Sequence, residues 1–163
     1  MATLLKLAET GEVIKVDPVL GLRELELRRI YLLPRAKNWL AEVLPETDSD
    51  RNIEEHPSQQ VDALFYEFCS GQPLPVGRRF KALVHLGDGV WELKTADVRL
   101  FGWFTQKDWF VVSDCDSKYN LMQRRDLYRG YCVQAVRLRE KLSLDEPKYI
   151  TGDNPDDVIS DCY

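Results

Sequence analysis

Basic side chains recur along three short apolar segments in the second half of the chain. They include Lys81, Lys94 and Arg99 at the start, end or centre of a segment, and Lys118 follows a further apolar segment at residues 109–113. Lys and Arg bind phosphate by charge, and the guanidinium of Arg adds a fork of donors. On neighbouring strands of a sheet, such cations would face the same binding partner. The pattern therefore predicts a compact sheet that presents Lys and Arg on one face.

Charge is unevenly distributed along the chain, whose formal net charge is −5. Residues 78–141 hold 13 basic and 8 acidic side chains, whereas residues 142–163 hold 1 basic and 6 acidic ones. Residues 1–77 hold 8 basic and 13 acidic side chains. A basic middle between acidic ends can bind a phosphate backbone, or its own tail can mask it.

Length and composition favour one domain with extensions, since the chain has 163 residues and is 44% hydrophobic. The apolar runs are far shorter than the roughly 18 residues that cross a membrane, and charges interrupt the first residues before a signal-peptide core forms. We expect a cytoplasmic protein. The cysteines at 69, 115, 132 and 162 have no CxxC spacing and the two histidines lie far apart. Free thiols are therefore expected, with no metal and no cofactor.

Periodicity predicts a strand at residues 28–33 followed by two helices. Pro34 is suited to the first turn of a helix, and Pro45 ends that helix. The second helix opens at Pro57 and its apolar residues recur at helical spacing until Gly71.

The remainder of the chain indicates a hairpin meander and a C-terminal helix. Residues 80–86, 90–94, 98–104 and 109–113 are strand-like and are separated by short turns rich in Gly and Asp. A helix is predicted for residues 119–142.

The predicted fold is α+β, with two N-terminal helices packed on a small antiparallel sheet. Residues 1–27 are expected to be an N-terminal extension, in which a small hairpin with a turn at Thr10 is one possibility. Residues 28–141 form the domain, and residues 142–163 form an irregular, partly mobile acidic tail.

Alternation along the strands assigns side chains to faces. In the segment 91–94, Trp91 shares one face with Leu93, and the two polar residues share the other. In the next strand, Arg99 shares its face with Phe101 and Trp103. Such half-polar alternation predicts a sheet with helices on one face and a partly open outer face.

The order strand, helix, helix and antiparallel meander resembles the RelE/HigB-like toxin superfamily over about residues 28–118. The quoted strings are KAL at 81–83, GVWELK at 89–94, DVRLF at 97–101 and WFVV at 109–112, closed by Lys118. Members of that family are small bacterial, plasmid and phage proteins. They commonly cleave mRNA in the ribosomal A site and are neutralised by a paired antitoxin.

The resemblance implies a metal-independent RNA endoribonuclease that blocks translation. That reaction needs a base near the ribose 2′-oxygen, cations around the phosphate and a proton donor for the leaving oxygen. Lys81, Lys94 and Arg99 are carried over to the concave face as catalytic candidates, and His85 is added as a possible proton-transfer group. The RNA-binding candidates are Arg78, Arg79, Lys118 and Tyr119.

Each candidate also has a structural interpretation. Arg99 is an ion-pair partner for Glu92 or Asp97 in the alternative reading, and Lys94 is a solvated strand end. Lys81 and its two arginine neighbours can protect an edge strand from aggregation.

Aromatic and imidazole side chains have similar alternatives. His85 is otherwise a hydrogen-bonded sheet residue. Trp103 and Trp109 can stack on bases, although core packing is the more common role of such residues.

Two functions of different classes follow. The first is a RelE/HigB-like toxin that acts on mRNA or the ribosome and is paired with an antitoxin protein. The second is a non-catalytic phage or regulatory protein of the same fold that binds and inhibits a host protein, which the acidic ends of the chain favour. No membrane partner is expected in either case.

Overall fold

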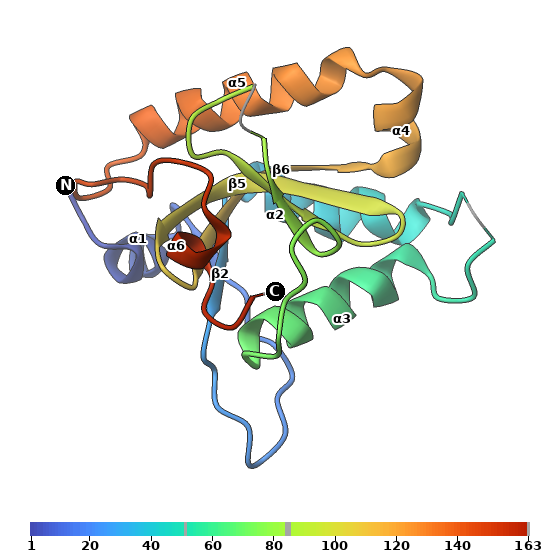
Figure 1. Cartoon of the computed structure of the whole chain (residues 1–163), viewed down its shortest axis with the longest axis horizontal. Helices are drawn as coiled ribbons and strands as arrows, with labels where there is room; N and C mark the ends of the chain where they lie inside the picture. The colour runs from blue at the N-terminus through green and yellow to red at the C-terminus, as the bar shows by residue number, and fades with distance from the viewer. Residues whose placement is uncertain (51, 84–85, 163) are drawn as a thin grey trace.

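The computed structural model describes residues 1–50, 52–83 and 86–162. It is an α+β structure built around a six-stranded mixed sheet with the strand order β1-β2-β6-β5-β4-β3 (Figure 1). The strands are β1 (Ile14–Lys15), β2 (Arg29–Leu32), β3 (Phe80–Ala82), β4 (Trp91–Lys94), β5 (Val98–Gln106) and β6 (Trp109–Ser117). The helices are α1 (Leu4–Thr10), α2 (Pro34–Asn38), η1 (Trp39–Val43), η2 (Leu44–Glu46), α3 (Pro57–Cys69), α4 (Lys118–Gln123), α5 (Asp126–Lys141) and α6 (Pro155–Val158).

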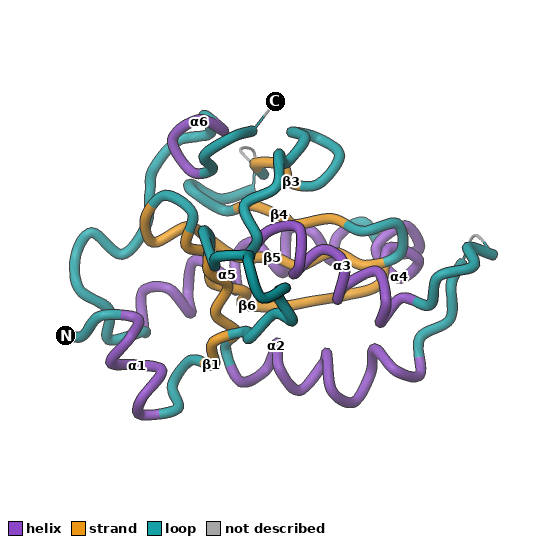
Figure 2. Tube along the Cα trace, turned by 90° about the horizontal axis from the view of Figure 1, so that it is seen from below, coloured by secondary structure: helices purple, strands orange, loops and turns teal. Residues whose placement is uncertain are grey.

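The predicted strand, helices and meander are present, but the sheet is larger than expected and is not purely antiparallel. β3, β4, β5 and β6 form the antiparallel meander, and β2 pairs with β6 in parallel. β1 extends the sheet beyond β2. Figure 2 shows the two edges, with β1 near α1 and α2 on one side of the molecule and β3 near α6 on the other.

Local sequence signals explain where the helices begin. Pro34 occupies the first turn of α2, which continues through the π-helical η1 into the 3₁₀ turn η2. In α3, the His56 side chain accepts from the backbone N–H of Ser58, while Gln59 accepts from the backbone N–H of His56. This capping box satisfies donors that a helix start leaves open. The predicted C-terminal helix is divided into α4 and α5.

Helices cover both faces of the sheet, so the partly open outer face expected from the sequence is wrong. One face packs Trp91, Leu93 and Leu100 against α2 and α3. The other face packs Phe101 and Trp103 against α1 and α5, which crosses the top of Figure 1. The predicted division of side chains between faces is confirmed. Trp103 is fully buried, which places it in the core rather than on a base-stacking surface.

The first residues form a helix rather than the predicted small hairpin. Thr3 caps α1 by accepting from the backbone N–H of Lys6, and Gly11 ends it with φ +82°. Leu4 and Leu7 are buried on the α5 side of the sheet. The capping residues and this apolar pair fix a helix, because only a helix places residues three apart on one face.

The C-terminal segment is packed on the domain. Val158 and Ile159 belong to the core on the α3 side. Ser160 donates its backbone N–H and its hydroxyl to Asp108, at 2.8 and 2.7 Å. Buried apolar residues and paired polar groups anchor this segment, in place of the mobile tail that its composition predicts. Among the described residues, no helix is long and apolar enough to cross a membrane.

Two glycines provide a matched test of the packing. A Cβ on Gly102 would lie 1.8 Å from the Val111 carbonyl oxygen, at a bulge between β5 and β6. We expect Gly102→Ala to lower the free energy of unfolding by about 1–3 kcal/mol or more, because the two strands must separate. Gly130 in α5 has open space around its Cα. Gly130→Ala should raise stability by about 1 kcal/mol. Urea denaturation of both variants measures the difference between their free energies of unfolding. Equal effects of the two substitutions on stability would contradict this packing.

Candidate functional site

Cations line an open cleft of about 410 Å³ at the end of the sheet where β4 turns into β5. The turn, the loop before β3, the start of α3 and the start of α4 all reach it, and these segments meet at the right of Figure 1. The cationic lining residues are Arg78, Arg79, Lys94, Arg99 and Lys118. The other lining residues are Ile53, Glu55, Gln60, Ala63, Thr95 and Ala96. Five of the residues proposed from the sequence thus share one cleft.

Buried Gln60 holds the β4–β5 turn against α3. Its Nε2 donates to Asp97 Oδ2 at 2.6 Å, and its Oε1 accepts from the Thr95 hydroxyl and the Asp97 backbone N–H at 3.0 and 2.9 Å. All three residues are buried. Because the amide uses both of its ends, the turn has one defined position relative to α3.

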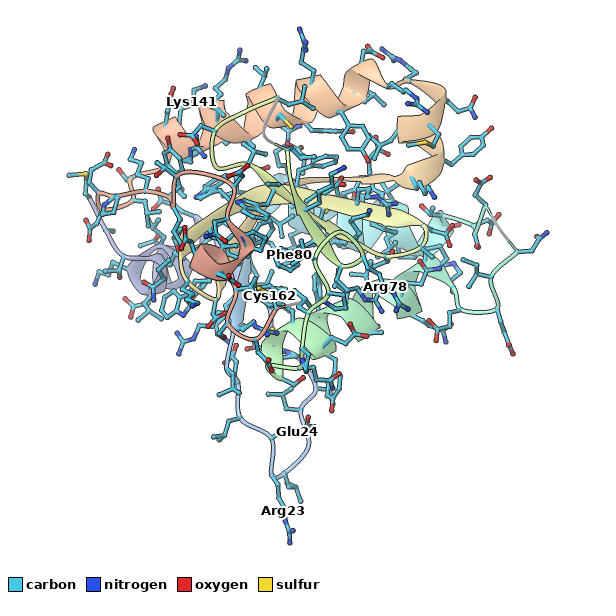
Figure 3. All side chains as sticks on the ribbon, viewed as in Figure 1. Arg23, Glu24, Arg78, Phe80, Lys141 and Cys162 are labelled. Carbon is cyan, nitrogen blue, oxygen red and sulfur yellow. The ribbon has the colours of Figure 1, made fainter. Side chains whose placement is uncertain are left out.

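Backbone pairing places the other cations around the turn. The Lys118 N–H donates to the Asp97 carbonyl at 2.7 Å, so the start of α4 lies beside the turn. The Lys94 N–H donates to the Arg79 carbonyl at 2.7 Å, which brings the loop before β3 to the same end of the sheet. Arg78 is exposed beside it, and Figure 3 labels its position near the turn.

Arg99 is the buried cation of the cleft, with only 7% of its surface exposed. Its Nη1 donates to the Thr95 and Val98 carbonyls, whereas its Nε has no hydrogen-bond partner among the described atoms. Among the described residues Arg99 makes no direct ion pair with Glu92 or Asp97, although its positive charge offsets part of the rise that burial causes in the pKa of the Glu92 carboxyl group. The Arg99 Nε is itself buried, and the guanidinium also interacts with the Tyr128 hydroxyl on α5.

Lys94 has an altered proton affinity. Partial burial, followed by the positive charges of Arg99 and Lys81, lowers the pKa of its ammonium group, while Glu92 raises it. Its Nζ donates to the Gly77 carbonyl at 2.9 Å. A lysine whose pKa is lowered by burial and by nearby cations loses its proton more readily than a solvated lysine. The neutral amine that results is the form that can act as a general base.

Glu92 lies beneath these cations and is buried against α5. Burial raises the pKa of its carboxyl group, and the charges of Arg99 and Lys94 partly offset that rise. Burial and Glu92 also raise the pKa of the Tyr128 hydroxyl on α5. The charge of the Glu92 carboxyl group is thus coupled to Arg99 and Lys94, two of the cleft cations.

The remaining predicted residues lie elsewhere. Lys81 is exposed on the edge strand β3, opposite Glu92, and does not line the cleft. This position agrees with its alternative role of protecting an edge strand. Tyr119 is 52% exposed and follows Lys118, outside the cleft lining. His85 lies outside the described residues.

Arg79 forms a side-chain ion pair, in which its Nη2 lies 3.0 Å from Glu67 Oε1. This contact holds Arg79 toward α3 rather than the cleft centre. The described C-terminal residues do not line the cleft, so they do not mask it in this structure.

Asp114 on β6 is buried and titrates near neutrality. Burial raises its pKa from an ordinary value of 3.8 to about 6, although the Arg35 Nε lies 2.6 Å from its Oδ1. The folded state therefore binds a proton more tightly than the unfolded state, so this group's contribution to stability is largest at low pH and falls as pH rises through 6.

This shift predicts a measurable pH dependence. Between pH 5 and 7.5, wild type should lose on the order of 1 kcal/mol more unfolding free energy than Asp114→Asn. Urea denaturation of both proteins at the two pH values gives the difference, in which groups common to both cancel. A loss equal in the two proteins, or greater in Asp114→Asn, would contradict the shift.

Sequence reasoning did not find Gln60, Thr95 or Glu55. Thr95 and Asp97 bracket a turn, and a Thr at such a position commonly bonds the backbone, which is a local signal. Gln60 has no comparable signal, because its role depends on a contact with residues 35 and 37 positions away in the chain.

Comparisons with protein families, curated proteins and solved structures give no match to this chain. The class of the protein therefore rests on the fold and on the cleft.

Proposed function

We propose that the cleft binds RNA phosphates and that the protein is a RelE/HigB-like, metal-independent endoribonuclease that blocks translation. The observation that carries this proposal is the gathering of Arg78, Arg79, Lys94, Arg99 and Lys118 at one end of the sheet. A chain with net charge −5 that concentrates cations in one cleft has a local attraction for anions despite its overall acidity.

The order of elements also supports the proposal. A strand, two helical segments and an antiparallel meander follow one another, and the first of these strands, β2, lies beside the last strand, β6. The resemblance in sequence covers the same residues. Fold alone does not define an activity, so the proposal depends on the chemistry of the cleft.

In the proposed reaction, Arg99 and Arg78 bind the non-bridging oxygens of the scissile phosphate. Lys94, once deprotonated, accepts the proton of the ribose 2′-hydroxyl, whose oxygen attacks phosphorus. The bond from phosphorus to the 5′-oxygen breaks, and that oxygen takes a proton from Lys118. The products are a 2′,3′-cyclic phosphate and a 5′-hydroxyl end. No bond to a metal is required in this sequence of steps.

A single-stranded RNA with labels at both ends, incubated with the purified chain in EDTA, tests the proposal. The expected products carry a cyclic phosphate on one fragment and a 5′-hydroxyl on the other. Lys107→Ala, at the exposed turn between β5 and β6, is the control and should cleave as wild type does. Intact RNA with the free protein and with purified ribosomes would contradict the enzymatic proposal.

A non-catalytic protein that inhibits a host protein is the second candidate. The observation that favours it is that cleft cations already have internal partners, since Lys94 bonds the Gly77 carbonyl, Arg79 pairs with Glu67 and Arg99 donates to the Thr95 and Val98 carbonyls. RNA binding without cleavage, or no RNA binding, would favour this candidate. Its partner would then carry an acidic surface to match the cleft.

A further inference from the structure

A loop of residues 17–27 extends from the domain between β1 and β2 and presents apolar side chains to solvent. It descends at the bottom of Figure 1, and Figure 3 labels Arg23 at its tip. Val19 is 92% exposed, Leu25 is 73% exposed, and Leu22 is fully exposed. Single exposed apolar residues are common, but several in one short segment mark a surface that binds another molecule.

Specific contacts hold this loop in one conformation. The Tyr66 hydroxyl on α3 donates to Glu24 Oε2 at 2.5 Å, and the Gly21 N–H donates to Glu24 Oε1 at 2.8 Å. Lys15 Nζ lies 2.7 Å from Glu26 Oε1 at the base of the loop. The apolar side chains are therefore presented by an ordered backbone, which reduces the entropy lost when a partner binds.

Glycine fixes the return of the loop to the domain. The Leu27 N–H donates to the Cys69 carbonyl at 2.8 Å, and a Cβ on Gly71 would lie 2.6 Å from Leu27 Cδ1. Gly71 has φ +79°, a conformation that glycine adopts readily. The close approach thus anchors the end of the loop to α3.

The tip and the base of the loop carry side chains of opposite charge. Arg23 at the tip has no described ion pair or hydrogen bond, while Asp17 at the base has a 91% exposed side chain, 3.5 Å from Lys15 Nζ. Two copies of the loop lying side by side in opposite directions would bring each Arg23 to the other copy's Asp17. The apolar residues between them would meet in the middle. This is the self-complementarity that a twofold interface requires.

We propose that residues 17–27 form the interface of a homodimer in which two loops pack antiparallel about a twofold axis. Val19, Leu22 and Leu25 are buried between the copies, and Arg23 pairs with Asp17 across the axis. The loop supplies fewer residues than the about 20 to 30 a side of a standard interface, so a dimer in the micromolar range is expected.

The apolar surface between α2 and α5 is a less suitable binding surface for the loop of another copy. Leu33, Pro34, Leu138 and Leu142 line it, and it belongs to the layers above and behind the sheet, whereas the loop extends below. A single contact between two different surfaces generates rings or open chains, and a twofold dimer of that kind would need both copies to insert their loops reciprocally. The loop-to-loop contact closes with two copies.

Sedimentation equilibrium of the full chain tests the dimer. Wild type should approach twice the monomer mass of 18.9 kDa at concentrations up to about 100 µM. Leu22→Asp should weaken the dimer at least about tenfold, since it places a charge in an apolar contact, while leaving the unfolding free energy unchanged. Val133→Asp, at an exposed apolar position on α5, is the control and should dimerise as wild type does.

Charge reversal tests the arrangement of the two loops. Arg23→Asp and Asp17→Arg should each weaken the dimer, and the two together in one chain should restore it, because each new pair again joins opposite charges. A wild-type monomer at every concentration would overturn the proposal. A dimer that Leu22→Asp leaves intact, or a doubly reversed chain that stays monomeric, would also overturn it.

Discussion

Arg99→Ala is expected to reduce RNA cleavage by at least about 100-fold, the loss typical for removal of one donor that stabilises transition-state charge. Arg99 is the cleft's buried cation, and its Nε has no hydrogen-bond partner among the described atoms. A buried guanidinium acts on a phosphate with little solvent screening, so its removal affects the developing charge more than removal of an exposed cation does. Single-turnover cleavage of a labelled RNA measures the change.

Controls separate the chemistry from the fold. Arg99→Lys keeps the charge and loses the fork of donors, so it should retain intermediate activity. Arg78→Ala, at the exposed cation of the cleft, should weaken RNA binding and reduce the dependence of affinity on salt, with a smaller effect on cleavage. Full activity from a folded Arg99→Ala protein would remove this residue from the mechanism.

Arg28→Met is expected to lower the free energy of unfolding by about 3–5 kcal/mol. The fully buried guanidinium joins three separate segments of the chain. Its Nη1 donates to the Phe68 and Gln72 carbonyls at 3.1 and 2.8 Å, and its Nη2 donates to the Ser160 carbonyl at 2.6 Å. Methionine fills part of the space but leaves these buried acceptors without a donor.

The same substitution at an exposed arginine controls for the loss of charge. Arg137→Met on α5 should change stability by less than about 0.5 kcal/mol, since that side chain is exposed. Urea denaturation of both variants gives the comparison. A loss below about 1 kcal/mol for Arg28→Met would show that the C-terminal segment does not depend on this residue.

Local patterns predicted much of the fold. The strand at residues 28–33, the helix starts at Pro34 and Pro57, and the meander strands follow from periodicity, proline and short turns. The assignment of side chains to the two faces of the sheet was also correct. These features depend on neighbours close in sequence, which is why one chain was sufficient to find them.

Features that depend on distant contacts could not be predicted. The prediction of an open sheet face was wrong because α5 packs over that face. Tyr128 and Tyr131 of α5 pack on Phe101, with ring centroids 5.5 and 4.9 Å apart. The C-terminal segment was predicted to be mobile because it is rich in Pro, Gly and Asp. Two of its residues, Val158 and Ile159, are nevertheless buried in the core. A composition average does not detect two apolar residues that find a core far away in the chain.

The candidate site was predicted in part. Residues on the β4–β5 hairpin and at the start of α4 meet in one cleft because strand pairing fixes their distance. Lys81 lies outside it because the edge strand β3 pairs it with Glu92 rather than with Lys94 at the turn end of β4. The supporting Gln60 was missed because a buried amide on a helix has no sequence signature.

Induced expression in a bacterial host tests the central claim most directly, with growth rate and newly made protein followed over the first half hour. The account predicts that translation stops soon after induction and that Arg99→Ala, made to the same soluble level, relieves the arrest. Sequencing of RNA 5′ ends from the arrested cells should then show new 5′-hydroxyl termini within mRNA. Normal growth and protein synthesis with abundant soluble wild-type protein would contradict the ribonuclease proposal and leave the host-protein inhibitor as the better account.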